Sequence, residues 1–136
     1  MTAREVLDGI KDRLTKATPG PWRAERYLYG PIEDGRIRVT SPSDTGIHNL
    51  AEDVLPSDAV FIAAAPVDVA RLTRAVEAVL GLADAWDSRG KHLMNYSEEC
   101  PESVKLELYE QGEEMADYAR KIRAAIEDAL NPKEGQ

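Results

Sequence analysis

The 136-residue chain has little cysteine and no long hydrophobic run. Its single cysteine, Cys100, cannot form an internal disulfide, which excludes a disulfide-stabilised secreted scaffold. No apolar run approaches the roughly 20 residues of a membrane span, and the N-terminus lacks the apolar segment of a signal peptide. We therefore expect a cytoplasmic protein with no membrane segment.

Positive charge is also scarce, because 17 Lys and Arg stand against 25 Asp and Glu, a net charge of -8. Such a chain repels the phosphate backbone, which argues against general DNA or RNA binding. The balance is uneven: residues 1–40 hold eight basic and six acidic side chains, whereas residues 41–136 hold nine and 19. A locally electropositive surface on an acidic body favours a small anionic ligand.

Residues typical of metal sites and nucleophilic catalysis are few. The only histidines, His48 and His92, have no second ligand at a spacing typical of zinc sites. Cys100 has no histidine near it in the sequence, and there is no glycine-rich phosphate loop. We therefore expect no cofactor, no metal and no enzymatic activity.

One acidic pattern is similar to the magnesium-binding signature of all-α nucleoside triphosphate pyrophosphohydrolases. It consists of Glu98, Glu99 and Glu102, followed by Glu114 and Asp117. A proline interrupts the first half, and only 11 residues separate the halves, too few for a second facing helix. We interpret the second half as a solvated helix face and keep the magnesium-dependent enzyme as an alternative.

Hydrophobic spacing predicts helices at both ends of the chain. Residues 3–17 carry one apolar face, begin at a Thr2–Glu5 capping box and end before prolines 19 and 21. A short helical piece is expected over residues 59–64 after a cap at Ser57, with a new helix beginning at Pro66.

Two later stripes repeat at spacings of three and four, as in coiled coils. The first comprises Val69, Leu72, Val76, Val79, Ala83 and Trp86. After a loop that contains Gly90 and runs through Pro101, a last helix over about 103–130 carries the second: Leu108, Gly112, Met115, Ala119, Ile122, Ile126 and Ala129. These stripes predict an antiparallel helical hairpin.

Alternating residues between the helices predict a small sheet. Residues 22–40 indicate a β-hairpin with a longer turn, and residues 47–54 indicate a third strand after a loop over 41–46. The predicted fold is α+β: an N-terminal helix, a small antiparallel β-meander and a long C-terminal antiparallel helical hairpin. We expect a single domain over 1–136, with helix and sheet in 1–56, the hairpin in 57–130 and a disordered tail over 131–136.

Two segments carry a family resemblance: the string Ala-Thr-Pro-Gly-Pro-Trp at 17–22, and residues 58–65 with Asp68 and Val69. The chain resembles small, mostly uncharacterised accessory proteins of actinobacterial phages and prophages over roughly residues 1–80, and departs from them at Pro66, where many carry Arg. The resemblance implies a phage protein of the host cytoplasm, in host takeover, counter-defence or regulation. It implies no catalytic residue.

A cluster of aromatic and basic residues is the candidate ligand site. Aromatic rings stack on bases and guanidinium groups bind phosphates. The cluster comprises Trp22, Arg23, Arg26, Tyr27, Tyr29, Arg36 and Arg38. The alternative is structural: Trp22 fills the core where the first helix meets the sheet, and the alternating arginines form a solvated strand face.

Apolar residues of the last helix that lie off its main stripe are the candidate oligomer interface: Leu106, Tyr109, Tyr118 and Leu130. A helix with more than one apolar stripe contacts two neighbours or exposes a partner surface. The hairpin therefore forms a homo-oligomer or docks on a host protein, unless these side chains meet the first helix of the same chain.

The sequence thus predicts a non-enzymatic phage accessory or counter-defence protein that sequesters a small anionic nucleotide-type signal. The alternative function is inhibition of a host factor by protein–protein contact, through the helical hairpin or the acidic surface.

Overall fold

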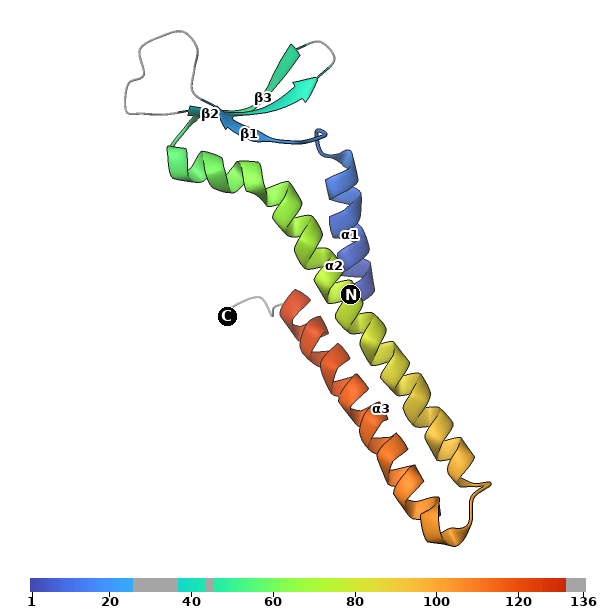
Figure 1. Cartoon of the computed structure of the whole chain (residues 1–136). Helices are drawn as coiled ribbons and strands as arrows, with labels where there is room; N and C mark the ends of the chain where they lie inside the picture. Colours follow the sequence, from blue (N-terminus) through green and yellow to red (C-terminus); the bar gives the residue numbers. More distant parts are fainter. Residues whose placement is uncertain (26–36, 44–45, 132–136) are drawn as a thin grey trace. The chain divides into compact units, whose positions relative to one another are not determined.

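A computed structural model describes residues 1–25, 37–43 and 46–131. Its elements, in chain order, are α1 (Ala3–Lys16), β1 (Arg23–Glu25), β2 (Ile37–Ser43), β3 (Gly46–Val54), α2 (Pro56–Ser97) and α3 (Glu102–Leu130), drawn in Figure 1. This arrangement confirms the predicted α+β class. The chain divides into two compact units: a helical unit of Met1–Gly9 with Thr73–Gln136, and a sheet unit of Ile10–Leu72.

The three strands form an antiparallel sheet in the order β1-β2-β3, as the meander prediction requires. Val39 of β2 lies opposite Ala24 of β1 and is buried. The predicted loop over 41–46 is too long, because β2 continues to Ser43 and β3 already begins at Gly46. Pro42 lies opposite Ile47 in this extension, so the proline does not end the strand.

Helix α2 corrects the prediction of a break before Pro66. It begins at Pro56, one residue before the predicted cap at Ser57, and continues through Pro66 without interruption. Proline suits the first helical position because its missing N–H has no partner there. Within a helix proline removes one hydrogen bond, a cost that surrounding packing can outweigh. Figure 1 shows α2 bending in its N-terminal third, the part that contains Pro66.

A second correction concerns Gly90, which lies within α2 rather than in a loop. A Cβ atom on Gly90 would come within 2.4 Å of the carbonyl oxygen of Gly112 on α3, and one on Gly112 would come equally close to the Gly90 oxygen. Two helix backbones therefore meet here, which only glycine permits. The turn between the helices shortens to residues 98–101, and the predicted antiparallel hairpin is confirmed.

The inward stripe of α3 agrees with the prediction, since Gly112 and Ala119 are buried. The inward stripe of α2 agrees only in part, since of its predicted members Ala83 is buried and Val76 packs against the core. Its buried members are small or polar, with one leucine: Thr73, Leu80, Ala83, Gly90 and Ser97. The predicted Val79 and Trp86 are exposed instead. Close approach at Gly90 leaves no room for large side chains, so the most apolar stripe of α2 lies outside the hairpin.

The apolar core of the helical unit is small. Ala3 and Leu7 of α1 pack with Leu80 of α2, flanked by Val76, Ile126 and Leu130. The predicted capping box starts α1: the Thr2 amide donates to Glu5 Oε2 over 2.7 Å, and the Glu5 amide donates to Thr2 Oγ1 over 3.3 Å. Hydrogen bonds from the Thr2 amide and the Thr2 hydroxyl to the Glu5 carboxylate lower the pKa of that carboxyl. In the described ranges no helix has the length and apolar character required to cross a membrane.

Candidate functional site

The predicted anion cluster is described only in part. Arg26, Tyr27, Tyr29 and Arg36 lie outside the described residues. Arg38 donates to Asn49 Oδ1 over 3.3 Å, and its guanidinium lies 3.9 Å from Glu25 Oε2. Arg23 is exposed on β1 opposite Thr40. Arg38 thus already contacts a carboxylate and an amide of the sheet, and anion binding by the cluster stays a prediction.

Trp22 has a packing role within the sheet unit. Its indole N–H donates to the carbonyl oxygen of Thr18 over 2.8 Å, and the Ser41 hydroxyl donates to the carbonyl oxygen of Pro19. The ring lines an apolar pocket of about 310 Å³ with Ile10, Arg13, Leu14, Ala17, Ala65, Pro66 and Val69. Residues from both segments of the phage-protein resemblance line this pocket, Ala17 and Trp22 from the first and Ala65 and Val69 from the second.

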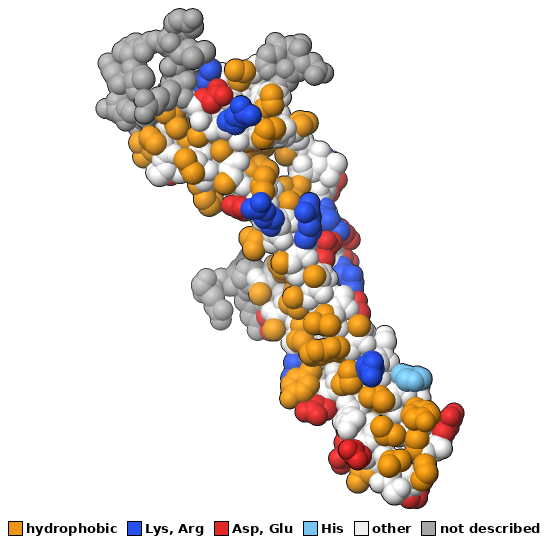
Figure 2. Space-filling view, viewed as in Figure 1, with side chains coloured by type: hydrophobic (Ala, Val, Ile, Leu, Met, Phe, Trp, Pro, Cys, Tyr) orange, Lys and Arg blue, Asp and Glu red, His pale blue; other side chains and the backbone are white. Residues whose placement is uncertain are grey.

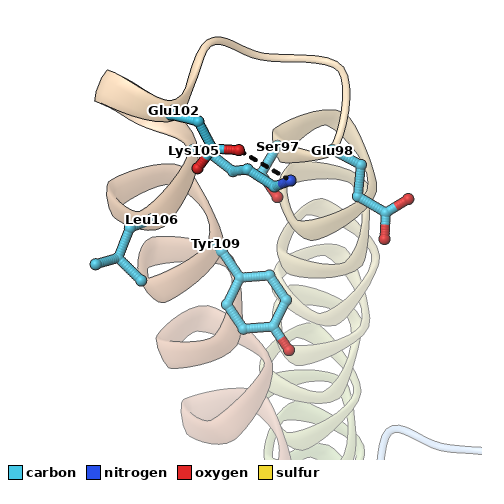
Figure 3. Close-up of a pocket in the computed structure, with 6 residues that line it drawn as sticks. All are labelled: Ser97, Glu98, Glu102, Lys105, Leu106 and Tyr109. Carbon is cyan, nitrogen blue, oxygen red and sulfur yellow. Dashed lines mark ion pairs between the residues drawn. The ribbon is translucent and has the colours of Figure 1, made fainter.

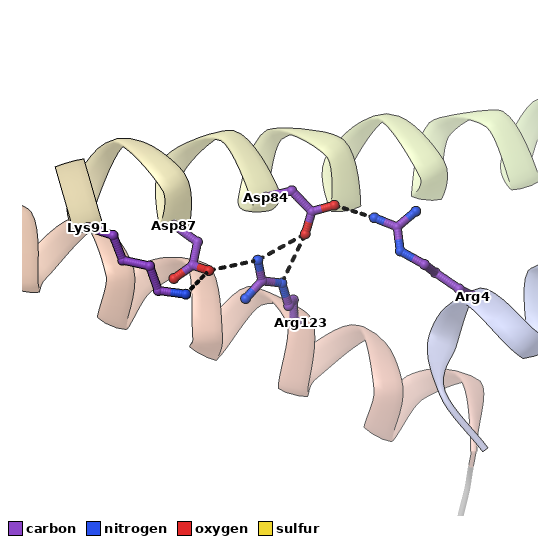
Figure 4. Close-up of polar contacts among 5 residues, drawn as sticks. All are labelled: Arg4, Asp84, Asp87, Lys91 and Arg123. Atoms are coloured by element: carbon purple, nitrogen blue, oxygen red, sulfur yellow. Dashed lines mark hydrogen bonds and ion pairs between the residues drawn. The ribbon is translucent and has the colours of Figure 1, made fainter.

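A network of ion pairs joins the three helices of the helical unit (Figure 4). Arg123 of α3 donates to Asp84 Oδ1 of α2 through Nε (3.2 Å) and Nη2 (2.9 Å), and Arg4 of α1 binds the other Asp84 oxygen. Asp87 lies 2.9 Å from Lys91 Nζ and 3.5 Å from Arg123. Each of the three cations is paired with Asp84 or Asp87, so the network links the helices to one another.

The network carries two displaced pKa values. Hydrogen bonding to Asp84 raises the pKa of the Arg123 guanidinium, and the hydrogen bond from Lys91 lowers the pKa of Asp87 below 3.8. The spacing of Asp87 and Lys91 was visible in the sequence. The pairing of Asp84 with Arg123 was not, because it depends on how the two helices align.

Replacement of Asp87 by Asn tests the network through pH. A carboxyl whose folded pKa is lowered stabilises the fold above its ordinary pKa, and this contribution disappears as the pH falls through the folded value. We expect Asp87→Asn to melt below the wild type near pH 7, with the gap closing as the pH falls below the ordinary Asp range through the lowered pKa of Asp87. Thermal melts across this range measure the difference. Glu113→Gln, an exposed carboxyl outside the network, should show no such convergence; a pH-independent gap for Asp87→Asn would contradict the assignment.

A second pocket, of about 630 Å³, lies at the turn of the hairpin (Figure 3). Its lining residues are Ser97, Glu98, Glu102, Lys105, Leu106 and Tyr109. Lys105 Nζ lies 3.7 Å from Glu102, and the Ser97 hydroxyl donates to the Met94 carbonyl over 2.6 Å. Glu98 and Glu102 belong to the magnesium-like pattern. Across the described part of the chain, no three His, Cys, Asp or Glu residues gather as a metal site would require.

The four candidate interface residues separate into two groups. Leu130 packs against the Ala3–Leu7–Leu80 cluster and so meets the first helix of its own chain. Leu106, Tyr109 and Tyr118 have exposed fractions of 67%, 45% and 50%. Leu106 and Tyr109 belong to the pocket at the turn, whereas Tyr118 lies further along α3.

Exposed hydrophobic side chains continue along the helices (Figure 2). On α2, Val79, Leu82 and Trp86 are 43%, 50% and 37% exposed, at the helical spacing that the sequence predicted for a packed stripe. We call these three residues and Tyr118 the outer face. Sequence reasoning named Tyr118 as a candidate interface residue, assigned Val79 and Trp86 to the inside of the hairpin and did not single out Leu82.

The outer face lies on the opposite side of the hairpin from the ion-pair network. Successive helical residues are 100° apart, so neighbours before and after an inward residue flank it on opposite sides. Trp86 and Tyr118 each come directly before a residue that faces the other helix of the hairpin. Asp84 and Arg123 each come directly after such a residue. Arg4 of α1 binds on the Asp84 side. The first helix therefore covers one side of the hairpin and leaves the outer face to solvent.

No protein-family model, no curated protein and no solved structure matches this chain.

Proposed function

We propose that this protein acts without catalysis, by binding another protein chain through the outer face of its helical hairpin. One observation carries the proposal: Val79, Leu82 and Trp86 in the middle of α2 are exposed, whereas the residues buried beside them are Leu80, Ala83 and Gly90. A contiguous apolar surface is stabilised by contact with a partner, at roughly 25 cal/mol per Å² removed from water.

The residue types of the outer face suit protein recognition. Val79, Leu82 and Trp86 are separated by three and four residues. Apolar side chains at this spacing lie on one side of a helix, where a second helix can pack against them. Tryptophan and tyrosine are enriched among residues that dominate binding energy in protein interfaces. If the protein is encoded by a phage, as the sequence resemblance implies, the partner chain can be a host protein.

Sequestration of a nucleotide-type anion ranks second. Of the residues proposed for it, the Trp22 indole and the Arg38 guanidinium already have partners in the sheet unit. Arg23 is exposed and accessible to an anion. Among the described residues of the cluster, one exposed arginine supports such a site less than four exposed apolar side chains support a protein interface.

Site-specific photo-crosslinking in cells tests the proposal. A photoreactive phenylalanine analogue replaces Leu82 of the outer face, and a matched protein carries it at Leu106, which is more exposed but lies outside that face. We expect a covalent adduct with a polypeptide from position 82 and at least tenfold less from position 106. Mass spectrometry of the adduct identifies the partner chain.

The matched position decides how the result is interpreted. Equal adduct yields from positions 82 and 106 would indicate contact by random collision and would contradict the proposal. The same is true if position 82 gives no polypeptide adduct although the protein is folded, as shown by its helical circular dichroism.

A further inference from the structure

We infer that the partner of the outer face is a second copy of this chain, and that the two hairpins form an antiparallel four-helix bundle about a two-fold axis parallel to the helices. This inference rests on the proposed function and names its partner. It follows from the position, relative to the apolar side chains of the face, of two charged side chains that form no ion pair with the residues the structure describes.

The contact between Gly90 and Gly112 fixes which residues of the hairpin lie at the same height. Because α2 and α3 are antiparallel, one step back along α2 from Gly90 corresponds to one step forward along α3 from Gly112. Arg89 therefore lies within about one residue rise, 1.5 Å, of Glu114 in height. By the same count, Trp86 lies within about two residue rises, roughly 3 Å, of Tyr118.

A two-fold axis parallel to the helices preserves these heights. It places α2 of each copy over α3 of the other, so every helix has antiparallel neighbours, as in ordinary four-helix bundles. Trp86 then meets Tyr118 of the second copy, and Arg89 meets Glu114 of the second copy. Aromatic packing and an ion pair form twice, once on each side of the axis.

Charge selects this axis over the one perpendicular to the helices. Along the outer stripe of α2, residues 75 to 93, the only charged member is Arg89. The corresponding stripe of α3 is mainly acidic, with Glu107, Glu114 and Asp128 against Lys121. A perpendicular axis would stack α3 on α3 and face two stripes that each carry three acidic side chains and one lysine, whereas the parallel axis places Arg89 of each copy beside Glu114 of the other.

Arg89 and Glu114 are available for such a contact. Both side chains are exposed, and neither forms an ion pair with any residue in the described ranges. Asp117, one turn further along α3, is by contrast occupied by Lys121 at 2.6 Å.

The first experiment measures the mass of the full-length protein by light scattering and sedimentation at about 100 µM and below. We expect a dimer whose dissociation constant rises at least 100-fold in Trp86→Glu, because a charge would enter the apolar seam. Leu106→Glu, an equally drastic change at a more exposed leucine, should leave the dimer unchanged. A monomeric wild type, or a dimer that tolerates Trp86→Glu, overturns the inference.

Reversing the two charges, singly and together, tests whether Arg89 pairs with Glu114 of the second copy, and it leaves the apolar contacts unchanged. Arg89→Glu and Glu114→Arg should each raise the dissociation constant about fivefold or more, an effect of roughly 1 kcal/mol. The double variant should return it to within about twofold of the wild type. Effects that simply add in the double variant overturn the pairing.

The single cysteine reports the direction of the axis. Cys100 lies in the hairpin turn and is partly exposed, so it accepts a spin label. A parallel axis puts both turns at one end, and we expect a label separation below about 30 Å. Residue 100 lies some 15 residues beyond the interface, about 22 Å, so a perpendicular axis gives roughly 45 Å or more and overturns the inference. If the protein is monomeric but position 82 crosslinks to another polypeptide, the proposed function stands and the second-copy inference fails.

Discussion

Replacement of Gly112 by alanine is expected to destabilise the hairpin by about 2 kcal/mol or more. The new Cβ would lie 2.4 Å from the Gly90 carbonyl oxygen and 2.9 Å from the Met94 side chain. The first contact is with backbone, so the two helices must separate. Overpacking of this kind costs roughly 1–3 kcal/mol, and a backbone clash falls at the upper end, which exceeds the gain of about 1 kcal/mol in helix propensity. Urea denaturation followed by circular dichroism measures the loss.

Gly81 provides the matched control on α2. A Cβ atom added there meets nothing within 4 Å. Gly81→Ala should therefore stabilise the protein by about 0.5–1 kcal/mol through helix propensity alone. The same substitution thus has opposite signs at two helical glycines. Stabilisation by both variants would show that the helices do not meet at Gly112.

Replacement of Leu80 by alanine is expected to cost about 2–4 kcal/mol. Leu80 is 4% exposed and packs between α1 and α3, against Leu7 and Ile126. Loss of a buried leucine removes transfer free energy and leaves a cavity. Few large apolar side chains are buried in the described residues, so this one change removes a large fraction of a typical stability of about 5–15 kcal/mol.

The comparison for Leu80 is Leu106→Ala, at a leucine that is largely exposed on α3. We expect a change within about 0.5 kcal/mol. Both variants are melted at one protein concentration, because association would otherwise shift the midpoint. If the two substitutions cost the same, the Ala3–Leu7–Leu80 cluster is not the core of the helical unit.

Local signals in the sequence predicted much of the fold. The capping box at Thr2 and Glu5 places the start of α1, and prolines 19 and 21 place its end. The alternation on both sides of Val39 predicted an antiparallel sheet, and the spacing around Ala119 predicted the inward stripe of α3. Each of these features depends on residues close together in the chain.

The errors concern features of α2 that depend on distant residues. Proline and glycine usually interrupt helices, yet Pro66 and Gly90 both lie inside α2. Gly90 is there because another backbone, that of Gly112, passes beside it. The inward stripe of α2 was predicted only in part: Ala83 is buried as expected, whereas Leu80 is buried in place of the predicted Val79.

The candidate site shows the same division. The residue types correctly indicated that α3 carries apolar side chains outside the stripe that faces α2. They did not indicate which neighbour each of these side chains contacts. Leu130 contacts the first helix, whereas Tyr118 is exposed. The distinction depends on the side of the hairpin that α1 covers, which Arg4 and Asp84 determine.

The crossing of α2 and α3 also limits how this sequence can evolve. A bulky substitution in most cores can be accommodated when a neighbouring side chain becomes smaller. At Gly90 and Gly112 each residue is opposed by the main chain of the other, and neither has a side chain left to shorten. A larger residue at one position therefore has no compensating change at its counterpart, and we expect both glycines to be invariant among any descendants that retain this hairpin.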